Sequence, residues 1–171
     1  MKPALLTAFV ILAGCGNGGT APVDPPPRPV DLFQENRDAI KLEDRDIDLY
    51  AERNGLQLRT GGTGVRHRLV RDNPGPTAKP GEWATVNYRL ELINGDSAYA
   101  SEPGKPESFK IEMDDVESGL HEAIQELSPG DSAIVIIPSY RAHGLIGDQQ
   151  RVPMRSTVVY HIGLVKVSEE P

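Results

Sequence analysis

The segment from Trp83 to Ile93 constrains the fold most, because apolar and polar side chains alternate along it. A period of two residues is typical of a strand with one buried face. Asn94-Gly95 follows directly and favours a tight hairpin turn, so the chain should return toward Tyr99. We therefore expect an antiparallel sheet. The inward positions of this first strand are Ala84, Val86, Tyr88, Leu90 and Leu92.

Two later segments repeat this period. Residues 108–113 and 157–167 alternate in the same way, which places Phe109 and Tyr160 on inward faces. Between them, residues 133–137 form an apolar β-branched run that Pro138 ends, and residues 139–156 form a long loop. Loops of that length are often functional. The apolar members of the two alternating segments are Phe109, Ile111, Met113, Val158, Tyr160, Ile162 and Leu164.

Two short strands are expected earlier in the chain, at residues 56–60 and 64–71, on either side of a Gly-Gly-Thr-Gly turn. Their register is left open by the pattern. The side chains that they offer to a core are Val65, Leu69 and Val70.

Two segments have helical spacing. Residues 34–53 carry Ile40, Ile47, Leu49 and Tyr50 among many charges, which predicts a weakly amphipathic helix, continuous or interrupted, that stops at Asn54-Gly55. Residues 115–127 predict a second helix that packs on the sheet, capped by Asp114 or Asp115 and stopped by Ser128-Pro129-Gly130. The apolar positions of this second helix are Val116, Leu120, Ala123, Ile124 and Leu127.

The N-terminal residues have the pattern of an exported lipoprotein. Lys2 gives a basic start, residues 4–12 are apolar, and Leu-Ala-Gly-Cys at residues 12–15 resembles a lipobox. The apolar stretch is too short to span a bilayer as a helix. The lipobox implies cleavage before Cys15 and acylation of its thiol and of the new amino terminus, and two or more chains make a stable anchor. An ordinary secretory signal with a chance cysteine is the alternative.

Charge and motif content exclude several classes of function. The chain has 18 Lys and Arg against 25 Asp and Glu, a net charge of -7, without the basic patch that nucleic acid requires. A single cysteine allows neither an internal disulfide nor a multi-cysteine metal site. There is no G-x-S-x-G elbow, no phosphate loop and no metal-like spacing among the four histidines. We expect no metal and no cofactor.

A group of aromatic and apolar residues remains, which the strands should gather around the second helix. From the residues alone these side chains are either plain core or the wall of an open pocket, where tyrosine hydroxyls could find partners. The members are Tyr88, Tyr99, Phe109, Val116, Leu120 and Tyr160.

The order of these elements, with GLHEAIQELSPGDSAIVIIPSYRAHG and VPMRSTVVYHIGLVKV, resembles an FKBP-type peptidyl-prolyl cis-trans isomerase domain over about residues 65–167. Its most specific parts are L-S-P-G-D, I-I-P-S-Y-x-A-H-G and V-P-x-x-S-T-V-V-Y. The resemblance implies an α+β fold in which an antiparallel sheet wraps around one short helix. The helical segment and residues 59–70 are similar to the lead segments of exported, lipid-anchored members in Gram-negative bacteria.

Carried over position by position, the resemblance assigns a proline pocket to nine residues. Leu120 would form its floor, where many members have Trp, and the Glu117 N–H and His143 would bind the substrate carbonyl. His143 stands where a Tyr is common, Glu117 where an apolar residue is usual, and Ala100 where members usually have Asp. The implied catalytic residues are His143, Glu117, Tyr88 and Leu120, and the implied substrate-binding residues are Tyr99, Phe109, Val116, Val152 and Tyr160.

These features together predict a lipid-anchored peptidyl-prolyl isomerase of the cell envelope, in the outer membrane facing the periplasm, that acts on proline-containing polypeptides as a monomer. The alternatives are a chaperone that holds proline segments with little turnover and a structural subunit of an envelope complex. The expected division is a signal peptide at 1–14, a linker at 15–33 lipid-anchored through Cys15, a helical lead segment at 34–63 and the isomerase domain at 64–171.

Overall fold

The computed structural model describes residues 31–170. The signal peptide, Cys15 and residues 16–30 of the expected linker lie outside the described residues. The chain divides into Met1–Asp31 and a unit from Leu32 to Pro171, and every helix and strand below belongs to the second unit. Among the described residues, no helix combines the length and the apolar character needed to cross a membrane.

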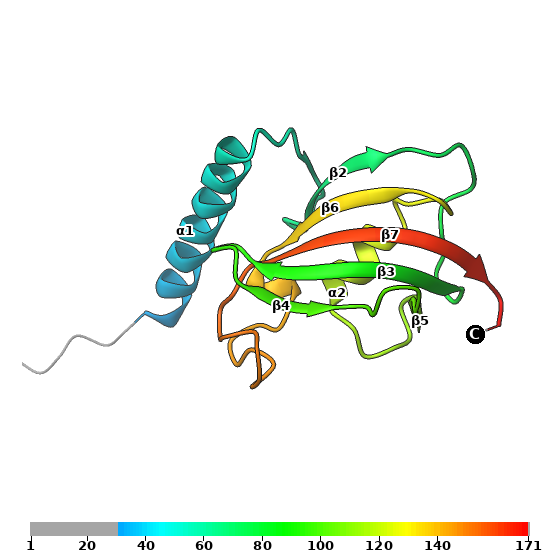
Figure 1. Ribbon diagram of the computed structural model, residues 1–171. Helices are drawn as coiled ribbons and strands as arrows, with labels where there is room; N and C mark the ends of the chain where they lie inside the picture. The colour runs from blue at the N-terminus through cyan, green and yellow to red at the C-terminus, as the bar shows by residue number, and fades with distance from the viewer. Residues whose placement is uncertain (1–30, 171) are drawn as a thin grey trace, which may run out of the picture. The chain divides into compact units, whose positions relative to one another are not determined.

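One antiparallel sheet of seven strands dominates residues 31–170, in the order β1-β2-β6-β7-β3-β4, with β5 also paired to β3 (Figure 1). The hairpin expected at Asn94-Gly95 joins β3 to β4, and β3 pairs with β7 along its whole length. The strands are β1 (Arg59–Thr60), β2 (Arg66–Arg71), β3 (Trp83–Leu92), β4 (Ser97–Ala100), β5 (Glu107–Lys110), β6 (Ser132–Ile137) and β7 (Val158–Ser168).

The main core lies between one face of this sheet and helix α2 (Ser118–Ile124), which Figure 1 shows behind the strands. The alternation in β3 is confirmed, because Ala84, Val86, Leu90 and Leu92 are buried and Tyr88 packs against the same core. Phe109 and Tyr160 are buried as well. The α+β architecture expected from the sequence, an antiparallel sheet around one short helix, is therefore confirmed.

A second, smaller core lies on the opposite face of the sheet, under helix α1 (Leu32–Arg53). Ile47 of α1 is fully buried against Ile136 of β6 and Val159 of β7, and Tyr50 packs beside them. The predicted helix is thus confirmed as one continuous element. The other two apolar residues named in the prediction, Ile40 and Leu49, are 36% and 45% exposed.

The structure corrects the segment that leads into α2. The strand β5 ends at Lys110, and Met113, expected inside, is 67% exposed. The cause is a turn in which the Asp114 carboxylate accepts the Lys110 backbone N–H at 2.6 Å while Glu112 adopts a left-handed backbone. Asp114 therefore closes this turn and caps no helix.

Three further boundaries differ from the pattern. Helix α2 covers only Ser118–Ile124, with Glu117 rather than an aspartate at its N-cap position and turns at residues 125–126. The strand expected at 56–60 shrinks to β1, because only Arg59 and Thr60 pair with β2. Val70, offered to the core by its spacing, is exposed, because a bulge interrupts the pairing of β2 with β6 at that point.

Candidate functional site

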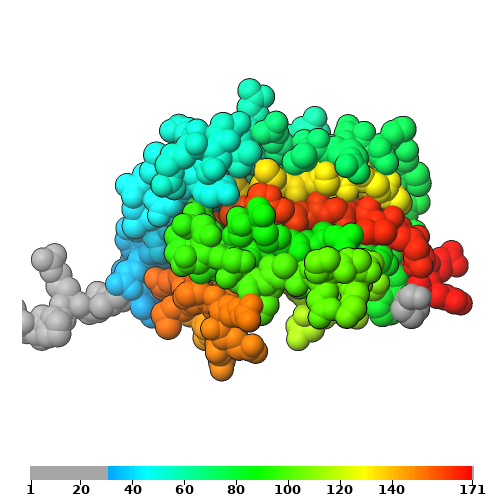
Figure 2. Space-filling view, viewed as in Figure 1, coloured from blue at the N-terminus to red at the C-terminus, as the bar shows by residue number. Residues whose placement is uncertain are grey.

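A cavity of about 510 Å³ opens on the inner face of the sheet, beside α2. Its walls come from the middle of β3, β4, β5, β7, the start of α2 and the loop between β6 and β7. Figure 2 shows a hollow at this edge of the molecule, between the protruding β6–β7 loop (orange) and the green segments that follow β3. Strands distant in sequence therefore contribute to one site.

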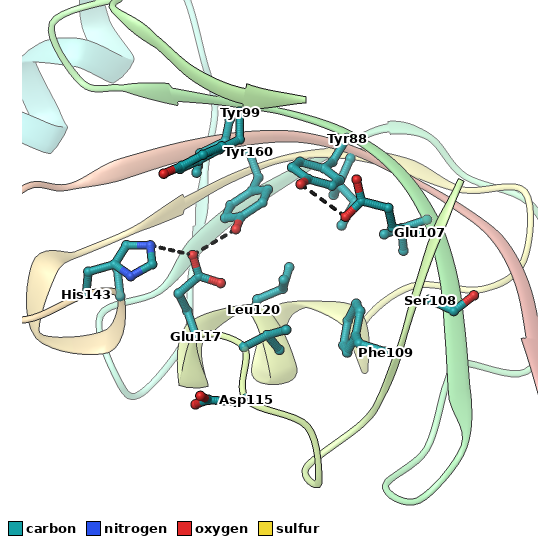
Figure 3. A pocket seen from close by; sticks show the side chains of 15 residues that line it. Tyr88, Tyr99, Glu107, Ser108, Phe109, Asp115, Glu117, Leu120, His143 and Tyr160 are labelled. Carbon is teal, nitrogen blue, oxygen red and sulfur yellow. Dashed lines mark hydrogen bonds and ion pairs between the residues drawn. The ribbon is translucent and has the colours of Figure 1, made fainter. Parts of the chain in front are cut away.

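The floor of the cavity is apolar. Leu120 points up from α2, with Phe109 of β5 beside it (Figure 3). Val116, from the segment before α2, also lines the cavity. Leu120 and Phe109 are almost fully buried. Above them, the rings of Tyr88 and Tyr160 lie 5.8 Å apart between centroids, tilted by 50°. This arrangement makes an aromatic wall over a floor that can exclude water.

The Glu117 carboxylate closes one side of the cavity and binds two groups from other elements. Its Oε1 accepts the Tyr160 hydroxyl at 2.8 Å, and Nε2 of His143 lies 2.9 Å from the same oxygen (Figure 3). The Glu117 side chain is only 9% exposed. Burial first, and then the neighbouring Glu117 charge, raises the pKa of Tyr160, so this hydroxyl remains a donor at neutral pH.

The other two tyrosines of the cavity also donate to carboxylates. Tyr88 donates to Glu107 at 3.2 Å, and Tyr99 donates to Asp148 of the β6–β7 loop. Burial, followed by the Glu107 charge, raises the pKa of Tyr88 to about 12. Burial opposes ionisation of Asp148, but the Tyr99 hydroxyl and three backbone N–H groups of its own loop outweigh it and lower the Asp148 pKa to about 2.

His121, on the far side of α2, fixes the turn that precedes Glu117. Its Nδ1 accepts the Glu112 N–H at 2.9 Å, so the neutral ring can donate from Nε2 to the Asp114 carbonyl at 3.1 Å. The ring also meets the Phe109 ring edge-on at 5.7 Å. A buried histidine therefore supports both the floor and the segment that carries Val116.

Eight of the nine residues assigned to the pocket line this cavity, and Val152 does not. Val152 lies in the main core, where its N–H donates to Asp148. Ala100, at the end of β4, is exposed and outside the lining. The eight lining residues are Tyr88, Tyr99, Phe109, Val116, Glu117, Leu120, His143 and Tyr160.

Several lining residues were missed from the sequence. Val86 and Leu90 share the inward face with Tyr88, and Ile162 shares it with Tyr160, so the same alternation could have found them. The polar ones could not be found in this way, because their positions depend on strand pairing and on the β6–β7 loop. The missed polar or small residues are Glu107, Ser108, Asp115 and Ala142, with Asp148 behind Tyr99.

Within residues 31–170, no three side chains of His, Cys, Asp or Glu come together in a way that could hold a metal ion. Every contact described for the cavity is a hydrogen bond, an ion pair or an apolar contact.

Comparison with known proteins finds one family over the region that carries the cavity. The sequence profile described as FKBP-type peptidyl-prolyl cis-trans isomerase matches residues 75–165, more than half of the chain. The FKBP-type peptidyl-prolyl cis-trans isomerase FkpA of Escherichia coli (strain K12) is 30% identical over 125 residues, 71% of this chain. Those residues are 44% of FkpA, so the chain spans less than half of that relative.

Two further comparisons agree. FK506-binding protein 1 of Kluyveromyces lactis is 31% identical over 105 residues, 59% of this chain and 92% of that protein. The crystal structure of Escherichia coli FkpA superposes with a TM-score of 0.66 at 26% identity, covering 81% of this chain and 65% of that one. The chain belongs to the family of FKBP-type peptidyl-prolyl cis-trans isomerases.

Proposed function

We propose that this protein accelerates the cis-trans isomerisation of X-Pro bonds in polypeptides, without a covalent intermediate. The observation that carries the proposal is the cavity itself, where an apolar floor around Leu120 lies beside the N-terminal end of α2. The backbone N–H of Glu117 sits at that end and donates to no group within residues 31–170. A prolyl ring on the floor would bring its peptide carbonyl near this free donor.

The chemistry required is small but the barrier is high. Rotation about an X-Pro bond must overcome roughly 18–20 kcal/mol because twisting destroys amide resonance. A twisted amide has less charge separation than a planar one, so a water-poor apolar cavity favours it. Leu120, Phe109 and the Tyr88–Tyr160 wall would supply that environment, and the Glu117 N–H would orient the peptide.

We propose a role for His143 that differs from the one expected by analogy with a tyrosine. Its Nε2 is shielded from solvent and lies 2.9 Å from Glu117 Oε1, a contact at ion-pair distance that lacks hydrogen-bond geometry, so we do not assign this nitrogen to a substrate carbonyl. The imidazole and the Tyr160 hydroxyl instead hold the Glu117 side chain against one wall. We propose that His143 acts by fixing Glu117, and thereby the direction of its N–H.

A specific observation favours a second function, the holding of proline segments with little turnover. All three tyrosine hydroxyls of the cavity are already bound to carboxylates: Tyr88 to Glu107, Tyr99 to Asp148 and Tyr160 to Glu117. Few side-chain donors are therefore left for a substrate. Under this alternative, proline peptides would bind, but their isomerisation would not be accelerated.

Exchange NMR on a short Ala-Leu-Pro-Phe peptide separates the two functions, using residues 15–171 with Cys15→Ser so that the thiol cannot dimerise. Catalysis predicts exchange cross-peaks between cis and trans forms at a small molar fraction of protein, and their loss in Phe109→Ala. The matched control is Phe33→Ala, because Phe33 is exposed on α1. Line broadening without exchange cross-peaks would support holding alone and contradict the proposed catalysis.

We further propose that the protein works at the cell envelope, anchored to the outer membrane through lipidated Cys15 and facing the periplasm. The support is the lipobox at residues 12–15 and the Gly- and Pro-rich residues 16–30, whose composition suits a tether to the domain at 64–171. Envelope polypeptides would then be its clients. Labelling of the expressed chain with radioactive palmitate tests the anchor: the label should be incorporated and should disappear in Cys15→Ser, and an unlabelled wild type would contradict it.

A further inference from the structure

The loop between β6 and β7 carries one wall of the cavity and is anchored from outside the isomerase domain. Ala142 and His143 of this loop line the cavity, and Asp148 holds Tyr99. Because β6 and β7 are neighbours that pair Ile137 with Val158, the two ends of the loop lie side by side. A contact that fixes both ends of the loop therefore also fixes the base of this wall of the cavity.

The side chain that meets both ends is Glu43 of α1. Its Oε1 accepts the Ser139 backbone N–H and the Thr157 hydroxyl, each at 2.5 Å, and its Oε2 accepts the Ser139 hydroxyl at 2.9 Å. Ser139 and Thr157 are both buried. One carboxylate thus receives three donors from residues 96 and 114 positions away in sequence.

The position of Ser139 is transmitted to the cavity through a short turn. The Ser139 carbonyl accepts the N–H groups of Ala142 at 3.1 Å and Gly144 at 2.8 Å. The two residues that flank His143 are therefore both hydrogen-bonded to Ser139. The Gly144 carbonyl in turn accepts the Arg155 N–H at 2.9 Å, which ties the outgoing half of the loop to the incoming half. A shift at Ser139 therefore displaces His143 relative to Glu117.

Glu43 is itself held in place by the rest of α1. Ile47, one turn further along the helix, is fully buried against β6 and β7. On the same helix, Asp44 and Asp48 lie 3.1 and 3.3 Å from the Arg66 guanidinium of β2. The helix cannot slide without breaking these contacts, so it presents the Glu43 carboxylate at a fixed point.

We propose that Glu43 is a positioning residue for the isomerase site, and that α1 contributes to that site through it. The carboxylate fits because all its partners are donors. A glutamine keeps the size but carries one NH₂ group. Turned toward the Ser139 N–H, it leaves that N–H without an acceptor; turned toward the Ser139 hydroxyl, it makes this hydroxyl an acceptor and leaves its O–H hydrogen without a partner. This inference rests on the proposed function for its activity readout only.

The experiment compares Glu43→Gln with Glu52→Gln in the full mature chain, because Glu52 is an exposed glutamate of the same helix. We expect kcat/KM on an X-Pro peptide to fall about tenfold in Glu43→Gln, since misplacing a site group by about 1 Å can cost up to 100-fold. Glu52→Gln should match the wild type. Thr157→Val, which removes one donor while keeping the shape, should give a smaller loss of the same kind.

Two readouts separate positioning from general destabilisation. In Glu43→Gln, hydrogen exchange should speed up at the Gly144 and Arg155 amides while the β3 and β7 amides keep their protection. The His143 imidazole resonances should shift in Glu43→Gln and stay in place in Glu52→Gln. Both can be measured whether or not the protein is an isomerase, so an inactive wild type would overturn the proposed function and leave this inference decided by them.

Two results would overturn the inference. One is wild-type exchange at Gly144 and Arg155 with unmoved His143 resonances in Glu43→Gln. The other is faster exchange spread evenly over β3 and β7, because the side chain would then contribute only to global stability. Should Glu43→Gln fail to fold, the same measurements on Thr157→Val decide between these outcomes.

Discussion

Removal of the Tyr160 hydroxyl should destabilise the protein far more than removal of the Tyr88 hydroxyl, although both are Tyr→Phe changes in one cavity. The Tyr160 hydroxyl donates at 2.8 Å to a Glu117 carboxylate whose side chain is 9% exposed. The Tyr88 hydroxyl donates at 3.2 Å to Glu107 at an exposed position. Water can replace the second bond and has little access to the first.

The magnitudes follow from that difference in exposure. A hydrogen bond to a charged group is worth about 1.5–3 kcal/mol, and a buried acceptor left without its donor retains its desolvation cost. We therefore expect Tyr160→Phe to lose about 2 kcal/mol of unfolding free energy and Tyr88→Phe less than about 1 kcal/mol. For a domain of this size, 2 kcal/mol corresponds to a fall in Tm of about 6 °C.

Thermal and urea unfolding of the two variants, with Glu117→Gln and the Tyr160→Phe/Glu117→Gln double variant, measure this directly. The double-mutant cycle should give a coupling of more than about 1 kcal/mol between Tyr160 and Glu117. Equal losses for Tyr160→Phe and Tyr88→Phe, or a coupling near zero, would refute the reasoning. Water or His143 alone would then be satisfying the carboxylate.

Three other outcomes follow from the cavity. Leu120→Ala should reduce kcat/KM on X-Pro peptides at least tenfold per folded molecule, whereas Leu127→Ala, equally buried but outside the lining, should lower Tm and leave kcat/KM of the folded fraction near wild type. The stabilisation that the Asp148 carboxylate gains from the Tyr99 hydroxyl and the three backbone N–H groups of its loop should be complete above about pH 4, because its pKa of about 2 lies below the ordinary 3.8. It should be lost as the pH falls toward 2. Urea titrations from pH 5 to pH 2 check this: the difference in unfolding free energy between wild type and Asp148→Asn should shrink on acidification, and a difference that grows would contradict it. Among the described residues that line the cavity, none is Lys or Arg, whereas Glu107, Asp115 and Glu117 are acidic. At low salt, peptides with Lys before proline should therefore be turned over about threefold faster than those with Glu, and the ratio should shrink in Glu107→Gln or in 0.5 M NaCl. Equal rates at low salt would contradict this prediction.

The parts of the fold that could be predicted are those set by local periodicity. Tyr88, Phe109 and Tyr160 were placed inward from alternation alone, because a strand with one covered face repeats every two residues whatever it pairs with. Alternation does not predict the burial of Val159. This residue lies on the opposite face of β7 from Tyr160 and is nevertheless fully buried, because α1 covers that face. No sequence pattern within β7 predicts that a helix from more than a hundred residues earlier covers this face.

The polar contacts of the site could not be predicted for the same reason. Asp148 meets Tyr99 and Glu43 meets Thr157 only after the sheet has brought distant segments together. The turn at Asp114 was missed because one side-chain bond to the Lys110 N–H ended a strand whose alternation would have continued. In each case the hydrogen bonds of a single carboxylate fix the position of a segment that the spacing of hydrophobic residues does not determine.

These carboxylates also decide between the two readings of the aromatic group. A sealed core would have to bury Glu107, Asp148 and Glu117 beside the tyrosines, and burying ionised carboxylates costs far more than a few neutral hydrogen bonds return. In the structure Glu107 is exposed and Asp148 is half-exposed, and only Glu117, with two partners, is nearly covered. Such partners are available to tyrosine hydroxyls only where the aromatic side chains line an opening. The carboxylates at the edge of the cavity that complete the hydrogen bonds of the tyrosines therefore require its mouth to stay accessible to solvent, while the floor around Leu120 stays apolar.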